Sequence, residues 1–241
     1  SVLTNFGSQA SFFLEPQNRV FATILFDKVN MATIFPSSAP PNTPKSEVRV
    51  REALAPIDGI VVFHSVLWQW RRKGKQSDGE ADFILIHLKY GIAILEVKGG
   101  GIELAEGKWY STDGRSECHQ IKNPFDQAKD SKYALLGYLQ AKEKQLASIP
   151  IVHGVVFPDI VVDETFGMYG HRDIILDRSD LGEPGSTLIR LFGHWRVNRQ
   201  ISRSELDLLV ALLAPTTRIR RLLSDDVADA DRKLLNLRRE Q

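Results

Sequence analysis

The sequence predicts a mixed α/β protein in which a central sheet is flanked by helices. Two strand-like segments, 82–88 and 92–98, are joined by residues 89 to 91, a connection short enough to force an antiparallel hairpin. A helical segment then precedes an apolar strand over 151–162. Because a helix can act as a crossover, that last strand is expected to lie parallel to an earlier one.

The chain before residue 46 is expected to be an N-terminal extension and a linker. Residues 12 to 26 predict two short strands with a turn, and residues 36 to 44 are rich in Pro and Ser, which is typical of an extended linker. Met31 is a candidate translation start. We therefore assign no function to residues 1 to 30.

Two helices and a charged tail complete the predicted order. Thr43 is a candidate cap, with Pro44 as the first residue of a helix, and Asn123 caps a second helix that opens with Pro124. A strand-like segment over 60–70 follows the first helix, and residues 173–176 are a further candidate strand. Residues 46–200 are predicted to form the principal domain, and residues 201–241 a helical C-terminal segment.

Composition excludes several classes of protein. The 241 residues include 31 Lys and Arg against 30 Asp and Glu, so a net charge of +1 creates no general attraction to nucleic acid. The 43% hydrophobic content is that of a globular protein, and no apolar run is long enough to span a bilayer. Cys118 is the single cysteine, which excludes an intrachain disulfide and favours the cytoplasm.

Three charged residues in the hairpin carry the candidate chemistry. Alternation along a strand places Glu96 and Lys98 on one face, and a turn at 89–91 sets Asp82 opposite residues 97 to 99. Two carboxylates with a backbone carbonyl between them offer the oxygen ligands that Mg²⁺ prefers. The Lys98 ammonium can orient a water molecule or neutralise charge on a phosphate, so this set predicts phosphodiester hydrolysis.

A Glu-x-Lys pair on a strand is usually a solvated ion pair, which is the alternative interpretation here. Glu96 follows the nearly unbroken apolar run 92–95, which is typical of a strand covered on both faces. An unpaired charge is costly in such a place. This context favours a functional role for Glu96.

The motifs in this region resemble a known family. The chain has Gly-Glu-Ala-Asp at 79–82, Gly-Ile-Ala-Ile-Leu-Glu-Val-Lys-Gly-Gly at 91–100, Trp109, and Asn-Pro-Phe-Asp-Gln-Ala at 123–128. Together with Glu47, these are similar to the nuclease-related domain NERD of the PD-(D/E)XK nuclease superfamily, from about residue 47 to residue 157. The resemblance implies a restriction-endonuclease-like core.

The resemblance also implies roles for individual residues. Asp82 and Glu96, with the carbonyl of Val97, would bind Mg²⁺ or Mn²⁺, and Lys98 would be the catalytic lysine. Glu47 would be the acidic residue of the first helix, and its spacing from Val50 and Leu54 places it on the inward face. Gln127 would be the polar residue of the next helix. Solvent-exposed structural roles for Glu47 and Gln127 remain open alternatives.

A basic loop is a candidate contact with DNA phosphates. It contains Arg71, Arg72, Lys73 and Lys75. Such a run is equally typical of a solvated turn. The six histidines show no metal-ligand spacing, so the sequence predicts no zinc site, and there is no phosphate-binding loop of the Gly-x-x-x-x-Gly-Lys type.

The sequence thus predicts a metal-dependent deoxyribonuclease of the endo or exo type, acting in DNA processing or in defence against foreign DNA. The C-terminal residues 225–241 resemble the segment that leads into the adenine-recognising glutamine motif of superfamily 1 helicases, which makes such a helicase, in cis or in trans, an expected partner. The alternative is a catalytically silent module of the same fold that binds nucleic acid or docks a protein. Polarity, sequence specificity and oligomeric state are not encoded in these motifs.

Overall fold

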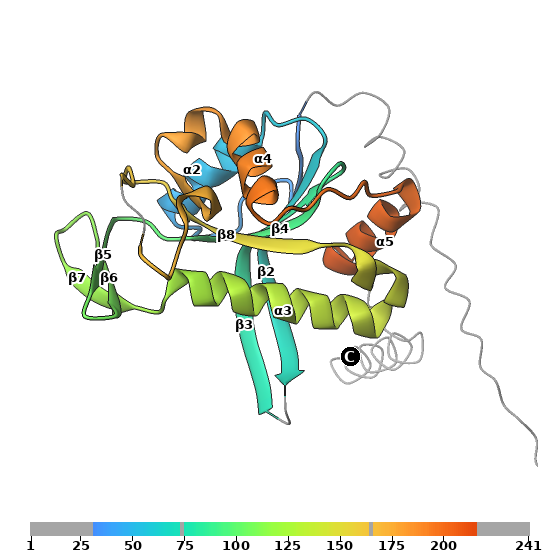
Figure 1. Ribbon diagram of the computed structural model, residues 1–241, viewed down its shortest axis with the longest axis horizontal. Coiled ribbons are helices and arrows are strands. Elements are labelled where there is room, and N and C mark those ends of the chain that lie inside the picture. The colour runs from blue at the N-terminus through green and yellow to red at the C-terminus, as the bar shows by residue number, and fades with distance from the viewer. Residues whose placement is uncertain (1–30, 73–74, 164–165, 216–241) are drawn as a thin grey trace, which may run out of the picture.

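The computed structural model describes residues 31–72, 75–163 and 166–215, and these form a mixed α/β fold (Figure 1). Its six-stranded sheet has the order β1-β2-β3-β4-β8-β9. The strands are β1 (Thr33–Phe35), β2 (Ile60–Arg72), β3 (Lys75–His87), β4 (Gly91–Val97), β8 (Ile151–Phe157) and β9 (Ile175–Asp177).

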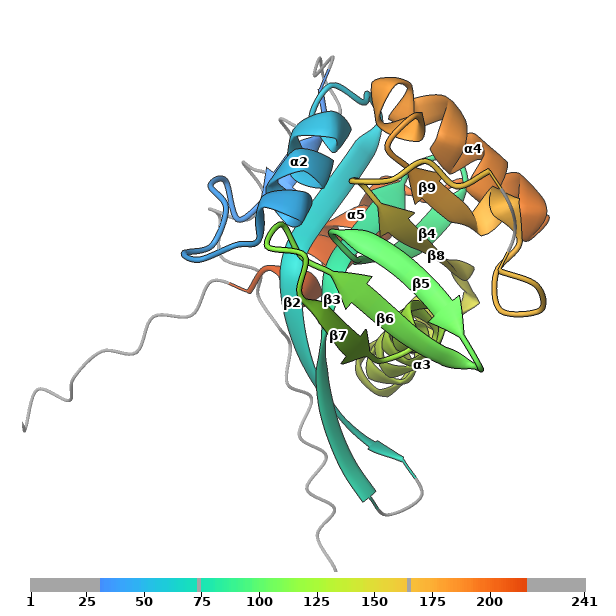
Figure 2. The same ribbon diagram turned by 90° about the vertical axis from the view of Figure 1, so that its left-hand side faces the viewer.

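Helices cover both faces of this sheet. Helices α2 (Lys45–Leu54) and α4 (Pro184–His194) lie on one face, and α3 (Pro124–Lys142) and α5 (Arg203–Leu213) lie on the other (Figures 1 and 2). The sheet therefore separates two apolar clusters, one containing Val50 and Leu191, the other Leu139 and Leu206. Three short 3₁₀ helices are η1 (Lys144–Ser148), η2 (Arg172–Ile174) and η3 (Asp180–Gly182).

The topology confirms the predicted hairpin and crossover. Strands β2, β3 and β4 are antiparallel neighbours, whereas β8 pairs in parallel with β4 after the chain passes through α3. Every residue of β4 and β8 is buried, as the apolar runs indicated. The predicted strand 151–162 ends early, at Phe157, because Pro158 has no amide hydrogen to donate to a neighbouring strand.

Of the two predicted helix N-caps, only the cap of α3 is confirmed. Asn123 caps α3, since its Oδ1 accepts a hydrogen bond from the Phe125 amide at 3.0 Å, and Pro124 is the first helical residue. Helix α2 instead begins at Lys45 with Pro44 in the cap position. The Thr43 hydroxyl donates to the Pro40 carbonyl at 2.7 Å, so the predicted cap stabilises the preceding turn rather than the helix.

A second sheet was not predicted from the sequence. It contains β5 (Gly101–Ala105), β6 (Lys108–Thr112) and β7 (Cys118–Ile121), all antiparallel, and it lies in the chain between β4 and α3 (Figure 2). Trp109 anchors it to the core. Its ring centroid is 5.6 Å from that of Phe125 and 4.9 Å from that of Phe166.

Strands β2 and β3 continue beyond the body of the protein as a long ribbon (Figure 1). Their inside–outside alternation reverses in the middle: Phe63 and Val66 lie in the same cluster although they are three residues apart. The reversal occurs at Ser65, whose φ of 60° is uncommon outside glycine. Ser65 lies across from Asp82, so the alternation reverses at the position of this predicted catalytic residue.

Several predicted features lie outside the described residues. Residues 1–30, with the two strands predicted within 12–26, are outside the described ranges. So are Lys73 of the basic loop and residues 216–241, which include the helicase-like segment. The candidate strand at 173–176 is partly confirmed, because η2 occupies its start and β9 begins at Ile175. Within the described ranges, no helix is long and apolar enough to cross a membrane.

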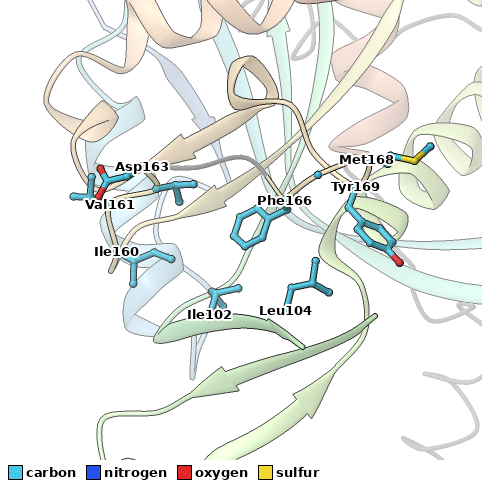
Figure 3. Close-up of a pocket in the computed structure, with 10 residues that line it drawn as sticks. Ile102, Leu104, Ile160, Val161, Asp163, Phe166, Met168 and Tyr169 are labelled. Atoms are coloured by element: carbon cyan, nitrogen blue, oxygen red, sulfur yellow. The ribbon is translucent and has the colours of Figure 1, made fainter. Parts of the chain in front are cut away.

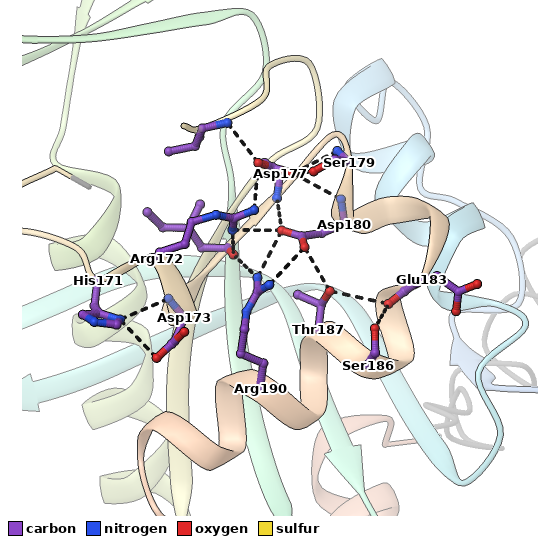
Figure 4. Close-up of polar contacts among 12 residues, drawn as sticks. His171, Arg172, Asp173, Asp177, Ser179, Asp180, Glu183, Ser186, Thr187 and Arg190 are labelled. Atoms are coloured by element: carbon purple, nitrogen blue, oxygen red, sulfur yellow. Dashed lines mark hydrogen bonds and ion pairs between the residues drawn. The ribbon is translucent and has the colours of Figure 1, made fainter. Parts of the chain in front are cut away.

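A polar network ties β9 to α4 (Figure 4). The fully buried carboxylate of Asp177 accepts hydrogen bonds from the Val162 amide at 2.9 Å and from Arg172 at 2.9 Å. Burial raises the pKa of Asp177, but hydrogen bonds from Ser179, Val162 and Asp180 outweigh it, so the net shift is downward. The folded protein therefore favours the ionised form of the Asp177 carboxylate.

We expect Asp177→Ala to lower the free energy of unfolding by about 3 kcal/mol, because it leaves buried donors and Arg172 unpaired. Urea denaturation measures the change. Asp58→Ala, at an exposed position, is the matched control and should stay within about 0.5 kcal/mol of the wild type. Equal stability of the two variants would contradict a structural role for the network.

Candidate active site

Three predicted site residues meet where β3 and β4 run side by side. Asp82 lies in β3, Glu96 lies near the end of β4, and Lys98 follows that strand directly. The Lys98 Nζ is 2.7 Å from Glu96 Oε1, and the Val97 amide donates to Asp82 Oδ2 at 2.7 Å. The structure therefore brings the two acids, the lysine and the Val97 backbone together.

The predicted register of this hairpin is wrong by about two residues. Phe83 pairs with Leu95, and continuing that register sets Asp82 across from Glu96 rather than from residues 97 to 99. The strands end at His87 and resume at Gly91, so the turn is 88–90, one residue earlier than expected. A one-residue move of the turn centre shifts the pairing by two, which keeps the side chains on their expected faces.

Glu96 is a carboxylate in an apolar environment. It is 2% exposed, and its Oε2 is buried with no hydrogen-bond partner among the described residues. Burial is the largest influence and raises the pKa of Glu96; the Lys98 ammonium opposes it, and the charges of Glu47 and Glu80 add to it. A buried oxygen without a donor is a suitable ligand for a cation.

Asp82 is perturbed in the same direction. Burial first, and then the nearby charge of Glu96, raise the pKa of Asp82 to about 7, although the Val97 amide and Lys98 pull it down. A carboxyl group that titrates near neutral pH is typical of functional sites. In the metal-free protein, Asp82 therefore exchanges its proton close to pH 7.

Helix α2 adds Glu47, together with a residue that the sequence analysis missed. Glu47 is half-buried, while Glu52 on the opposite face is exposed, as the helical spacing predicted. Its Oε2 lies 3.0 Å from Nε2 of His64, a buried histidine of β2 that stacks on Phe83 at a centroid distance of 4.4 Å. The sequence offered one signal for His64, because it is a polar residue within the apolar strand-like segment 60–67.

The remaining predicted site residues make fewer contacts with the group of Asp82, Glu96 and Lys98. Gln127 is half-buried in the first turn of α3, and no hydrogen bond joins its side chain to another described residue. Glu80 is exposed on β3, and it accepts a hydrogen bond from Ser65. Arg71 and Lys75 lie at the far end of the ribbon, where the backbone alone is described, and Arg72 pairs with Lys75 across it.

A hollow of about 590 Å³ lies beside the residues that follow Lys98. Its lining includes Lys45 and Ser46 from α2, the glycines 99–101, and Asp159. Gly100 has a φ of 80°, and a Cβ there would lie 2.2 Å from the Thr112 carbonyl oxygen. The absence of a side chain at Gly100 therefore permits this close backbone approach.

A larger hollow of about 980 Å³ lies between β5 and the segment that follows β8 (Figure 3). Its labelled side chains are mainly apolar, with Ile102 and Leu104 below Phe166. None of the predicted catalytic residues lines it. They are absent from the lining of the smaller hollow too, but that hollow begins at Gly99, the residue after Lys98.

The fold and this acid–lysine arrangement define a nuclease-like α/β domain. Comparison with family models agrees: residues 44–158 match NERD, the nuclease-related domain. The match covers α2 through β8 and thus all the predicted catalytic residues. Comparisons with curated proteins and with solved structures gave no match.

The raised pKa of Asp82 makes a stability prediction. An acid whose pKa is higher in the folded state than in the unfolded state stabilises the fold at low pH, and that contribution is lost as pH rises from about 4 to 7. We expect Asp82→Asn to raise the free energy of unfolding of the metal-free protein at pH 8 by about 1–3 kcal/mol. The gain should vanish near pH 4.

Denaturant titrations at pH 4, 6 and 8 in the presence of a chelator measure this difference. Asp58→Asn, at an exposed position, should show no comparable pH dependence. An Asp82→Asn variant that is no more stable than the wild type at pH 8 would contradict a raised pKa of Asp82 in the folded protein.

Proposed function

We propose that this nuclease-related domain hydrolyses DNA phosphodiester bonds with the help of Mg²⁺ or Mn²⁺. The observation that carries the proposal is the buried Glu96 carboxylate, with one oxygen bonded to Lys98 and the other without a partner in the described structure. Burying such a group lowers stability. A catalytic task accounts for its presence in the fully buried strand β4.

The donor set fits a hard cation. Asp82 and Glu96 would each supply a carboxylate oxygen, and the Val97 carbonyl would supply a third ligand. The amide and the carbonyl of one strand residue point toward the same edge, so the 2.7 Å bond from the Val97 amide to Asp82 places that carbonyl on the Asp82 side. A Mg²⁺ ion held there supplies Lewis acidity toward the scissile phosphate.

The chain's own residues supply the remaining functions. The Lys98 side chain is 23% exposed, so its ammonium reaches solvent while it stays 2.7 Å from Glu96. It is placed to stabilise negative charge that develops on the phosphate. Glu47 is fixed by His64 and adds a third carboxylate, which is suited to orienting a water molecule or an additional cation.

The hollow beside glycines 99–101 is a fitting place for the phosphate backbone. Lys45 supplies a positive charge, and Ser46 and Ser111 supply hydroxyl groups. Asp159 holds the walls together, because it accepts a hydrogen bond from the Gly100 amide at 2.7 Å and pairs with Arg49 of α2. Substrate bound there would lie next to Lys98.

Plasmid cleavage tests the proposal. We expect the wild type to nick or linearise supercoiled DNA with Mg²⁺ or Mn²⁺ and to stop when a chelator is added. Glu96→Gln and Lys98→Ala should each reduce the cleavage rate by about 10²-fold or more, since both groups act on the reacting phosphate.

Glu52→Gln and Lys89→Ala are matched controls, because both residues are exposed. Glu52 lies on the face of α2 opposite Glu47, and Lys89 lies in the turn between β3 and β4. They should cleave at the wild-type rate. DNA binding without cleavage under every metal tried would favour the alternative, a catalytically silent binding module. Full activity of Glu96→Gln would contradict the assignment of the site.

DNA contact through the tip of the β2–β3 ribbon is part of the proposal. If Arg71, Arg72, Lys73 and Lys75 bind phosphates, replacing all four with Ala should weaken binding to all DNA sequences equally. Each lost contact should also flatten the slope of log affinity against log salt by about one unit. Lys98→Ala should leave that slope unchanged.

Fluorescence anisotropy over a range of salt concentrations measures the slope. A charge-matched control replaces four exposed lysines elsewhere, namely Lys89, Lys108, Lys142 and Lys144. An unchanged slope in the ribbon variant would identify the ribbon tip as a solvated turn. We also propose a superfamily 1 helicase as the partner that presents DNA to the domain.

A further inference from the structure

We propose that His171, Asp173 and His194 form a second metal site, separate from the nuclease site and suited to Zn²⁺ or a similar transition-metal ion. These side chains offer one ligand atom each, and the three atoms lie within 4.8 Å of one another. The proposal concerns residues outside the nuclease-related match at 44–158 and does not depend on the nuclease function.

The distances between the ligand atoms fit a small coordination shell. Asp173 Oδ2 lies 3.2 Å from His171 Nδ1 and 3.4 Å from His194 Nδ1. Ligands at about 2.0–2.1 Å from a tetrahedral zinc ion are about 3.3 Å from one another. Side chains already at this spacing need little rearrangement to bind the ion.

The Nδ1 atom of His171 faces two groups of Asp173. It accepts a hydrogen bond from the Asp173 amide at 3.2 Å and lies 3.2 Å from Asp173 Oδ2 (Figure 4). An imidazole nitrogen has one lone pair in the ring plane, so a cation bound at Nδ1 would replace the hydrogen bond from the amide. The same cation would offset the repulsion between Nδ1 and the carboxylate oxygen.

The fold holds the ligands in place from two separate segments. His171 caps η2, and His194 is the last residue of α4. Between them in the chain, Arg172 is bonded to Asp177 and Asp180, which fixes the backbone around Asp173. The two imidazole rings are 4.9 Å apart, and the His194 ring packs edge-on against Trp195. The site would join η2 to the end of α4.

The chemistry of the donors selects the ion. Imidazole nitrogen favours Zn²⁺, Ni²⁺ or Cu²⁺, whereas the carboxylates and carbonyl of the nuclease site favour Mg²⁺ and Mn²⁺. Three protein ligands leave a fourth position for water, and His171, which is exposed, leaves the site open to solvent. Zn²⁺ is therefore the probe that separates the two sites.

A second cluster, Asp113, Glu117 and His119, serves as an internal comparison. It offers one imidazole, and its His119 Nε2 lies 4.0 Å from Asp113 and 3.7 Å from Glu117. The Asp113 carboxylate already accepts hydrogen bonds from the Arg115 and Glu117 amides. All three residues are exposed, so we assign no site to this cluster.

Zinc titration of the full chain tests the proposal. After chelator treatment, calorimetry and thermal melting should show one Zn²⁺ bound with a raised melting temperature. His171→Gln, His194→Gln and Asp173→Asn should each weaken that binding at least tenfold and abolish the rise in melting temperature. X-ray absorption should find two nitrogen ligands at about 2.0–2.1 Å.

Three controls make the outcome decisive. Glu96→Gln, in the nuclease site, and His119→Gln, in the comparison cluster, should bind Zn²⁺ as the wild type does. His194→Cys should retain binding and add a sulfur ligand at about 2.3 Å, even if the Gln variants prove less stable. Wild-type affinity in the His171→Gln, His194→Gln double variant would overturn the proposal, as would loss of binding in Glu96→Gln.

Discussion

The burial of negative charge at the end of β4 is the constraint on which the site depends. Glu96 lies in a strand with no exposed residue, and its carboxylate accepts a hydrogen bond from Lys98. Asp82 and Glu47 bring further negative charge to the same place, as the upward shifts of the carboxyl pKa values show. The surrounding core of β4 and β8 is what keeps this unfavourable arrangement folded.

The central part of the fold was predictable because it follows from short-range rules. A short turn between two apolar runs forces a hairpin, and the helix after Asn123 permits a parallel return strand. The acids and the lysine were predictable for a similar reason, since charged residues stand out in an apolar strand. The α2 acid, Glu47, followed from its spacing to Val50 and Leu54.

Features that depend on long-range packing were not predictable. The β5–β7 sheet consists of short, partly exposed strands, and its anchor Trp109 is recognisable only once Phe125 and Phe166 are placed beside it. His64 gains its significance from a helix 17 residues earlier in the chain. The histidine cluster also escapes sequence spacing, because His194 and Asp173 are 21 residues apart and meet through the packing of α4 on η2.

The turn at 88–90 determines which side chains reach the site. Side chains alternate with a period of two along β4, so inserting or deleting one residue in this turn would exchange the positions of Glu96 and Val97 relative to β3. A valine would then occupy the place of the buried carboxylate, and the glutamate would turn into the apolar layer around Leu95. Insertions in this turn are therefore tolerable only in pairs.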